Sequence, residues 1–204
     1  MTKLRKYSLV VVYEHKTKPL CSDYSDDDDD MSWKVRRSAS KVLCAIIESR
    51  SDLLQQIYED VAPVLISRFK EREESVRVDI LQTFIALLRQ TSPANGSNSD
   101  TAMDTTDGPR QLLRALVPKI SRALAKQLSA KSTQTRQIGF HLLRELIVVL
   151  HGGLDDQIEL FFPAIEASLS NMASEQQQHA SSSNLKIEIL YFLRLFFHNR
   201  LTEN

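Results

Sequence analysis

The chain contains few of the residues that interrupt or cross-link a small fold. Its 204 residues include two cysteines, five glycines and six prolines, and aromatic residues make up 7%. Cys21 and Cys44 are too few for a disulfide framework, so we expect a reducing compartment. A composition this poor in glycine, proline and aromatic residues favours helices over sheets.

The chain also has no excess of positive or negative charge and no long apolar run. The 26 lysines and arginines balance 26 aspartates and glutamates, whereas a dedicated nucleic-acid binder normally carries a basic face or has a pI above about 9. The longest apolar runs, such as residues 42–47 and 146–150, are far shorter than the roughly 20 residues of a membrane span. We therefore expect neither a nucleic acid nor a membrane as partner.

The residues of a chemical site do not occur together either. The five histidines have no metal-ligand spacing among themselves or with the cysteines. Cys44 belongs to a predicted helix without a histidine or asparagine constellation, and the chain has no glycine-rich phosphate loop. We therefore expect no catalytic residue, no metal or cofactor site and no small-molecule substrate, and a protein that is not an enzyme.

What the chain does contain is an internal repeat. Counting from Val35, Val76, Thr135 and Leu185, apolar or small residues recur at offsets 4, 7, 8, 11 and 12, which is one face of an α-helix. The residue that follows each start is a cation: Arg36, Arg77, Arg136 and Lys186. A cation in the first helical turn is unfavourable to the helix dipole, so we expect each to reach a carboxylate or carbonyl in the adjacent inter-helix turn.

A second kind of helix alternates with the first. Residues 53–70, 111–128 and 157–170 each contain a proline at an equivalent place, namely Pro63, Pro118 and Pro163. A proline in a helix interior costs about 3 kcal/mol, so its recurrence indicates a kink that belongs to the repeat unit.

The spacing of the repeats predicts the fold class. The four starts are 41, 59 and 50 residues apart, and without the polar low-complexity loops the period is about 40–45 residues, typical of HEAT and armadillo arrays. We predict an all-α, HEAT-type α-solenoid (an armadillo-like superhelix) of about three helix pairs and one leading helix. The predicted segments are a leading second helix at 31–50, repeats at 52–91, 110–150 and 155–200, and flexible loops at 92–109 and 172–183. Residues 1–30, with an acidic tract of Asp23 and residues 26–30, are predicted to be disordered.

The ends of this array carry their own expectation. Neither end has the polar outer face of a capping repeat, so we expect the chain to be part of a longer array. Uncapped ends expose apolar surface, which predicts self-association.

The helical wheel predicts which residues of the second helices face outward. Offsets 2, 6, 9 and 13 lie opposite the apolar face. They are Arg37, Lys41, Cys44 and Glu48; Val78, Gln82, Ile85 and Arg89; Gln137, His141, Arg144 and Val148; and Ile187, Tyr191, Arg194 and His198. Our hypothesis is that the five cations Arg37, Lys41, Arg89, Arg144 and Arg194 form a stripe that meets an acidic partner, with His141 and Tyr191 on the same face. The alternative is that they are ordinary solvated helix charges, since an exposed ion pair contributes only about 0–1 kcal/mol.

Several stretches resemble one known family. Tyr24–Ser25, the aspartate run and residues 31–37 (MSWKVRR) are similar to the acidic insertion and following helix of the Cand-type cullin-associated, neddylation-dissociated proteins. Residues 65–74 (LISRFKEREE), 135–137 (TRQ) and 181–187 (SSSNLKI) resemble later stretches, in the family's order. The resemblance covers roughly residues 23–204, whereas family members are several times longer and built of HEAT repeats throughout.

The resemblance implies a function without chemistry. Cand-type proteins wrap around a cullin–RING scaffold that lacks its ubiquitin-like modifier, and they promote exchange of the substrate-receptor modules of SCF-type ubiquitin ligases. The chain is then expected to be a middle part of such an interaction scaffold, in the cytoplasm and nucleus. Three alternatives remain: a HEAT-type transport receptor that holds basic cargo, another protein-binding scaffold segment, or a truncated product with no autonomous activity.

Overall fold

The computed structural model describes residues 32–92, 107–150, 154–174 and 180–202. Within these ranges every regular element is a helix and none is a strand, which confirms the all-α prediction. The expectations for residues 1–30 and for most of the two loops lie outside the described residues.

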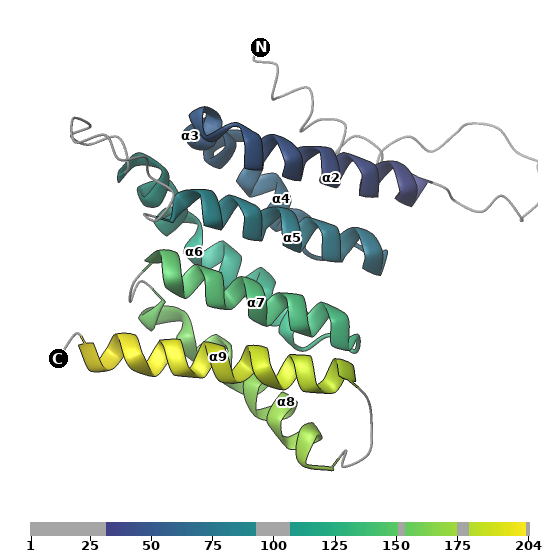
Figure 1. Ribbon diagram of the computed structural model, residues 1–204, viewed down its shortest axis with the longest axis vertical. Coiled ribbons are helices and arrows are strands. Elements are labelled where there is room, and N and C mark those ends of the chain that lie inside the picture. Colours follow the sequence, from purple (N-terminus) through teal and green to yellow (C-terminus); the bar gives the residue numbers. More distant parts are fainter. Residues whose placement is uncertain (1–31, 93–106, 151–153, 175–179, 203–204) are drawn as a thin grey trace, which may run out of the picture.

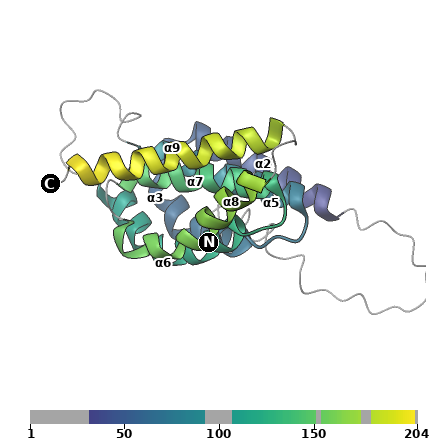
Figure 2. The same ribbon diagram turned by 90° about the horizontal axis from the view of Figure 1, so that it is seen from below.

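The helices form two layers. Four long helices lie side by side in one layer (Figure 1): α2 (Ser32–Ser49), α5 (Glu74–Thr91), α7 (Thr133–Leu150) and α9 (Ala180–Thr202). The other layer lies behind them (Figure 2) and holds η2 (Ser51–Leu53), α3 (Leu54–Gln56), η3 (Ile57–Val61), α4 (Ala62–Arg68), α6 (Asp107–Leu128), η5 (Asp155–Leu160) and α8 (Phe162–Ser174). Each long helix packs on the next in chain order, α2 on α5, α5 on α7 and α7 on α9. This stacking confirms the HEAT-type solenoid.

The helix type changes just before two of the three recurrent prolines. A π-helical turn, η3, precedes α4, and the amide of Ala62 donates to the carbonyl of Ile57 five residues earlier. A 3₁₀ segment, η5, precedes α8, where the amide of Phe161 donates to the carbonyl of Ile158 over 3.0 Å. Proline has no amide hydrogen and cannot donate the hydrogen bond of a regular α-helical turn. Because that bond is already missing, a π-helical or 3₁₀ turn before the proline costs few further hydrogen bonds. Pro118, by contrast, lies inside the continuous helix α6.

Helices extend into both predicted loops, so the loops are shorter than predicted. Helix α6 begins at Asp107, inside the predicted loop 92–109, and Gly108 and Pro109 belong to its first turn. The first-turn amides of a helix have no intrahelical acceptor, so a proline is tolerated there. Helices α8 and α9 likewise extend into the predicted loop 172–183, to Ser174 and from Ala180.

Three residues of the predicted apolar faces are exposed. The exposed fractions are 52% for Val35 and 56% for Val42 on α2, and 58% for Phe197 on α9. The prediction that they are buried is wrong for a simple reason: α2 and α9 are the outer members of the described row of long helices. One flank of each is not covered by another described helix.

A close helix contact at Gly139 leads to a stability prediction. A Cβ atom at this position of α7 would lie 2.9 Å from Cδ2 of Leu128, which is itself fully buried. We expect Gly139→Val to lower the free energy of unfolding by about 1–3 kcal/mol, because the core there is already filled. Urea unfolding followed by circular dichroism measures the change. The control is Gly108→Ala, whose Cβ meets only Gln55 at 3.7 Å, and equal stability of the two variants would contradict the expectation.

Candidate partner-binding surface

The four long helices carry the seven residues predicted to bind a partner. Lys41 and Arg194 are exposed, and neither makes a hydrogen bond or ion pair within the described part of the chain. Tyr191 is also exposed, and its ring lies 5.9 Å from the guanidinium carbon of Arg144. These three residues are available to a partner as the structure stands.

The other cations of the predicted stripe are engaged inside the chain. Each makes an ion pair with a carboxylate of the next long helix. The pairs are Arg37 Nε to Asp79 at 2.9 Å, Arg89 to Glu145 at 3.2 Å and Arg144 to Glu188 at 2.9 Å. The arginines of α2, α5 and α7 therefore tie neighbouring repeats together, and Arg37 and Arg89 remain about half exposed.

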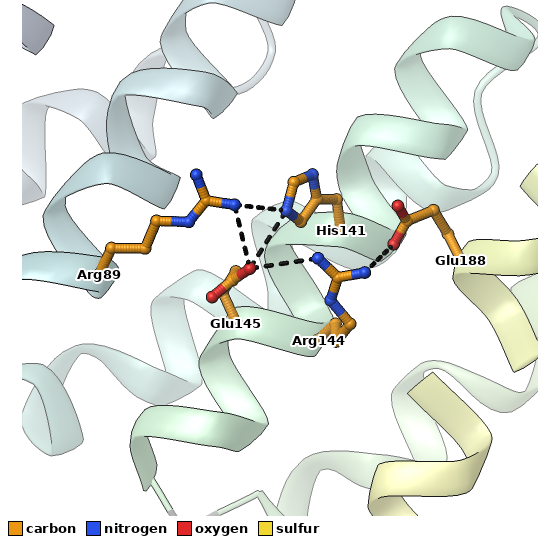
Figure 3. A network of polar contacts seen from close by, with 5 residues as sticks. All are labelled: Arg89, His141, Arg144, Glu145 and Glu188. Atoms are coloured by element: carbon orange, nitrogen blue, oxygen red, sulfur yellow. Dashed lines mark hydrogen bonds and ion pairs between the residues drawn. The ribbon is translucent and has the colours of Figure 1, made fainter. Parts of the chain in front are cut away.

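Glu145 contacts more side chains than the other carboxylates of these ion pairs. Its Oε1 atom lies within 3.1–3.2 Å of side-chain nitrogens of Arg89, His141 and Arg144, and Figure 3 shows the arrangement. The hydrogen bond with His141, followed by that with Arg144 and the charge of Arg89, lowers the pKa of Glu145 from 4.5 to about 2, against the opposing effect of partial burial. Through Glu188, the same network reaches α9.

His141 contacts two groups through the same atom, Nε2, and the two contacts require different protonation of that atom. Its Nε2 lies 3.0 Å from a nitrogen of Arg89 and 3.1 Å from Oε1 of Glu145. Arginine can only donate, so a bond from Arg89 requires a bare Nε2. A bond to Glu145 requires a hydrogen on the same atom. The imidazole can therefore satisfy one neighbour or the other, and its tautomer decides which.

The first-turn cations meet the inter-helix turns in part. Arg36 pairs with Glu71 in the turn between α4 and α5 at 3.3 Å, and Arg77 donates to the carbonyl of Glu71 at 2.7 Å. These two contacts confirm the expectation. Arg136 reaches only the hydroxyl of Thr133 at 3.4 Å, so for α7 the expectation is wrong. For Lys186 the turn before α9 lies outside the described residues.

Ile85 was expected to face outward, and this prediction is wrong. Its side chain is fully buried. Arg144 holds the equivalent position on α7, and there it pairs with Glu188 of α9. The position at offset 9 thus belongs to the flank that meets the following helix, and the wheel misassigned it because it treated each helix as covered on one side only.

Three carboxylates that complete the interhelical pairs were not predicted: Asp79, Glu145 and Glu188. Asp79 and Glu188 stand at the same place, three residues after the start of their segments. Aligning the repeats for charge as well as for apolar residues could have found them. The pairs themselves depend on which sides of two neighbouring helices meet. A helical wheel describes one helix and does not contain this information.

The described residues contain no group of three or more histidines, cysteines, aspartates or glutamates that could hold a metal ion. Burial and the nearby Glu48 raise the pKa of the Cys44 thiol, so the reactive thiolate is disfavoured. None of the helices in the described ranges is long and apolar enough to cross a membrane.

Comparison with known proteins gives extended matches to proteins named as cullin-associated. It is 45% identical over 166 residues, 81% of its length, to cullin-associated NEDD8-dissociated protein 1 of Arabidopsis thaliana. It is 42% identical over 173 residues, 85% of its length, to the protein of that name from Dictyostelium discoideum. The chain matches part of the cullin-associated NEDD8-dissociated proteins. This confirms the Cand-type resemblance; no family model matches the chain.

The match extends to a second protein of this type. Cullin-associated NEDD8-dissociated protein 2 of Mus musculus is 43% identical over 172 residues, 84% of the chain. In each of these three cullin-associated NEDD8-dissociated proteins the matched stretch is 13% of the relative's length. The chain therefore spans about an eighth of these relatives.

Proposed function

We propose that the chain is a non-enzymatic interaction scaffold that binds a cullin–RING complex lacking its ubiquitin-like modifier. The support is the match of most of the chain to proteins named as cullin-associated and NEDD8-dissociated. Because the matched stretch is 13% of those relatives, the affinity of this stretch by itself is the central question.

The observation that carries the proposed binding mode is the pair of exposed, unpaired cations on the long-helix layer. Lys41 and Arg194 lie on the outer helices α2 and α9 and make no ion pair within the described part of the chain. Tyr191, three residues before Arg194 on α9, supplies an exposed aromatic ring. Such a surface fits a partner with acidic groups, since charge complementarity steers association.

The first experiment is a pull-down of a purified cullin–RING heterodimer by the chain. The unmodified and the NEDD8-modified cullin are compared side by side. Selective capture of the unmodified form is the expected result. Failure to capture either form, with circular dichroism showing folded helices, would mean that this stretch does not bind by itself.

Charge reversal tests the surface more sharply. We expect Lys41→Glu combined with Arg194→Glu to lower the association rate for the unmodified complex roughly 3- to 10-fold at low salt, and less at high salt. The control is Lys119→Glu with Lys126→Glu, which makes the same charge change at exposed positions of α6 in the other layer. Arg144 is left unchanged, because reversing it would also break its pair with Glu188. Equal rates for the two double variants would rule out the surface.

We further propose that such binding promotes exchange of substrate-receptor modules of SCF-type ubiquitin ligases, in the cytoplasm and nucleus. The support for this step is the resemblance to the Cand-type family. A receptor-exchange assay with the purified complex, with and without the chain, tests it, and an unchanged exchange rate would contradict it.

A further inference from the structure

Positive charge is concentrated in the middle of the chain, on α6 and the residues that follow it. Between Gly108 and Leu154 the sequence contains eight lysines and arginines but only one carboxylate, Glu145. Since the two signs balance over the whole chain, the remaining residues carry an excess of negative charge. Five of the eight cations are exposed on α6 or in the turn before α7: Arg114, Lys119, Arg122, Lys126 and Lys131.

The four exposed cations of α6 lie on one side of the helix, which we call the α6 face. With 3.6 residues per turn and Arg114 at zero, Arg122, Lys126 and Lys119 point to about 80°, 120° and 140°. The opposite side packs on the rest of the chain and holds fully buried residues, among them Leu113, Ile120 and Leu124. From Arg114 to Lys126 the α6 face is about 18 Å long, because an α-helix rises 1.5 Å per residue.

The charges of the α6 face are not compensated within the described residues. Arg114, Lys119 and Lys126 make neither a hydrogen bond nor an ion pair there. Nε of Arg122 donates to the carbonyl of Pro118 over 3.1 Å, and this contact leaves the charge of the guanidinium unpaired. The arginines of α2, α5 and α7 pair with carboxylates of the next long helix, whereas the cations of α6 point to solvent.

The elements on either side of α6 carry exposed carboxylates. Helix α6 contacts η3 of the preceding repeat and η5 of the following one. Glu59 on η3 and both Asp156 and Glu159 on η5 are exposed. A broad anionic surface laid over α6, such as a DNA duplex or a lipid bilayer, would bring negative charge against these carboxylates. A single narrow strand of negative charge fits the α6 face better.

The α6 face also offers no apolar or aromatic anchor. Within the described residues from α3 to α7, no large hydrophobic side chain is exposed. Proteins hold single-stranded nucleic acid largely by stacking bases on aromatic rings, and a basic helix binds a membrane by inserting apolar side chains as well. Charge is therefore the main attraction of this face, and a polypeptide rich in carboxylates supplies its complement.

We propose that the α6 face binds an extended acidic segment of a partner protein. Neighbouring cations on the face are about 4–8 Å apart along the helix axis. In an extended chain the side chains of one face recur about every 6.6–6.8 Å, so acidic residues at alternate positions can each meet a cation. Five or six residues span the face. This surface lies in the layer opposite to the long helices, so it goes beyond the proposed cullin contact.

The experiment measures binding of a defined acidic peptide to the full chain. The probe is a fluorescent eight-residue peptide in which glutamate alternates with serine, and the control peptide has glutamine in place of each glutamate. Fluorescence anisotropy at about 50 mM salt follows both without any cullin. We expect saturable binding of the acidic peptide alone, and a progressive loss of affinity as the salt concentration rises, because salt screens exposed charges.

Two double variants locate the binding site. Lys119→Glu with Lys126→Glu should weaken peptide binding at least fivefold, because two attractions are replaced by repulsions. The matched control is Lys70→Glu with Arg72→Glu, which makes the same charge change at exposed positions in the turn after α4. It should alter the affinity less than twofold. Circular dichroism verifies that both variants remain helical.

A conservative variant tests whether charge is what the site requires. Lys119→Arg with Lys126→Arg keeps both positive charges and should bind the peptide like the unaltered chain. Absence of saturable binding to the unaltered chain would overturn the proposal, and so would equal losses in the two charge-reversal variants.

The other possible occupants are decided by the same assay. Tighter binding of an oligothymidylate of eight nucleotides, or of phosphatidylserine vesicles, would overturn the assignment to an acidic polypeptide. Peptide binding that appears only after residues 26–30 are replaced by asparagine would assign the α6 face to the chain's own aspartates and not to a partner. Because no cullin is present, these outcomes are separate from the cullin pull-down, in which Lys119→Glu with Lys126→Glu is expected to behave like the unaltered chain.

Discussion

Glu145→Gln is expected to lower the free energy of unfolding by about 2 kcal/mol at pH 7. The carboxylate accepts charge-assisted hydrogen bonds from Arg89 and Arg144, and hydrogen bonds to charged groups contribute about 1.5–3 kcal/mol each. We take the lower part of that range because the site is partly open to water, which screens the charges. Without the carboxylate the two guanidinium groups face each other with no intervening negative charge (Figure 3).

The loss depends on pH in a defined direction. The pKa of Glu145 is lowered in the folded chain to about 2, from an ordinary value of 4.5. Its contribution to stability is therefore complete above pH 4.5 and disappears as the pH falls from 4.5 toward 2. Urea unfolding of the unaltered chain and of Glu145→Gln across this range measures the difference, which should shrink as the pH falls.

A matched carboxylate makes this test specific. Glu166 on α8 is exposed and has no ion pair within the described residues. Glu166→Gln should change the unfolding free energy by less than about 0.5 kcal/mol. A difference between the unaltered chain and Glu145→Gln that stays constant from pH 7 to pH 2.5 would show that the charge of Glu145 is not what stabilises the contact.

Phe84→Ala is expected to be the most destabilising single change, at about 3–5 kcal/mol. Phe84 of α5 is fully buried and meets the edge of Phe69 in the turn after α4, with ring centroids 5.4 Å apart and an interplanar angle of 88°. Removing the ring leaves a cavity between the two layers and breaks an aromatic contact. Since domains of this size are stable by about 5–15 kcal/mol, the loss is a large fraction of the total. Thermal and urea unfolding followed by circular dichroism measure it.

The control for this prediction is a phenylalanine that the structure leaves in solvent. Phe197 of α9 is 58% exposed, although the repeat pattern assigns both residues to the apolar face. At a concentration where the chain is monomeric, Phe197→Ala should cost less than about 1 kcal/mol. Equal destabilisation by the two substitutions would mean that Phe197 is covered in the folded chain.

Periodicity alone predicted the parts of the fold that depend on one helix at a time. The four long helices and their apolar faces follow from the spacing of residues such as Ile80 and Leu143, because burial of one helical face requires that spacing. The two-layer arrangement followed from the alternation of two kinds of helix. Two of the four first-turn cations, Arg36 and Arg77, met the expected turn.

The features that were not predicted depend on two helices at once. Ile85 and Arg144 occupy equivalent positions, yet one is a core residue and the other bridges two repeats. The difference arises from the residue on the facing helix, which a pattern along one segment does not contain. The binding role of the seven proposed residues stays a prediction, since three of the arginines already have acidic partners in the chain.

The ion pairs also determine how the row of helices can bend. The Glu145 network joins α5, α7 and α9, because Arg89 lies on the first, Glu145 and Arg144 on the second and Glu188 on the third. Rotation at one of these two junctions strains the contacts of the other, so the two angles change together. The junction of α2 and α5 has its own pair, Arg37 with Asp79, and Arg77 of α5 in turn contacts the hydroxyl of Thr135 on α7. A bend at one junction is thus passed on to the next along the row.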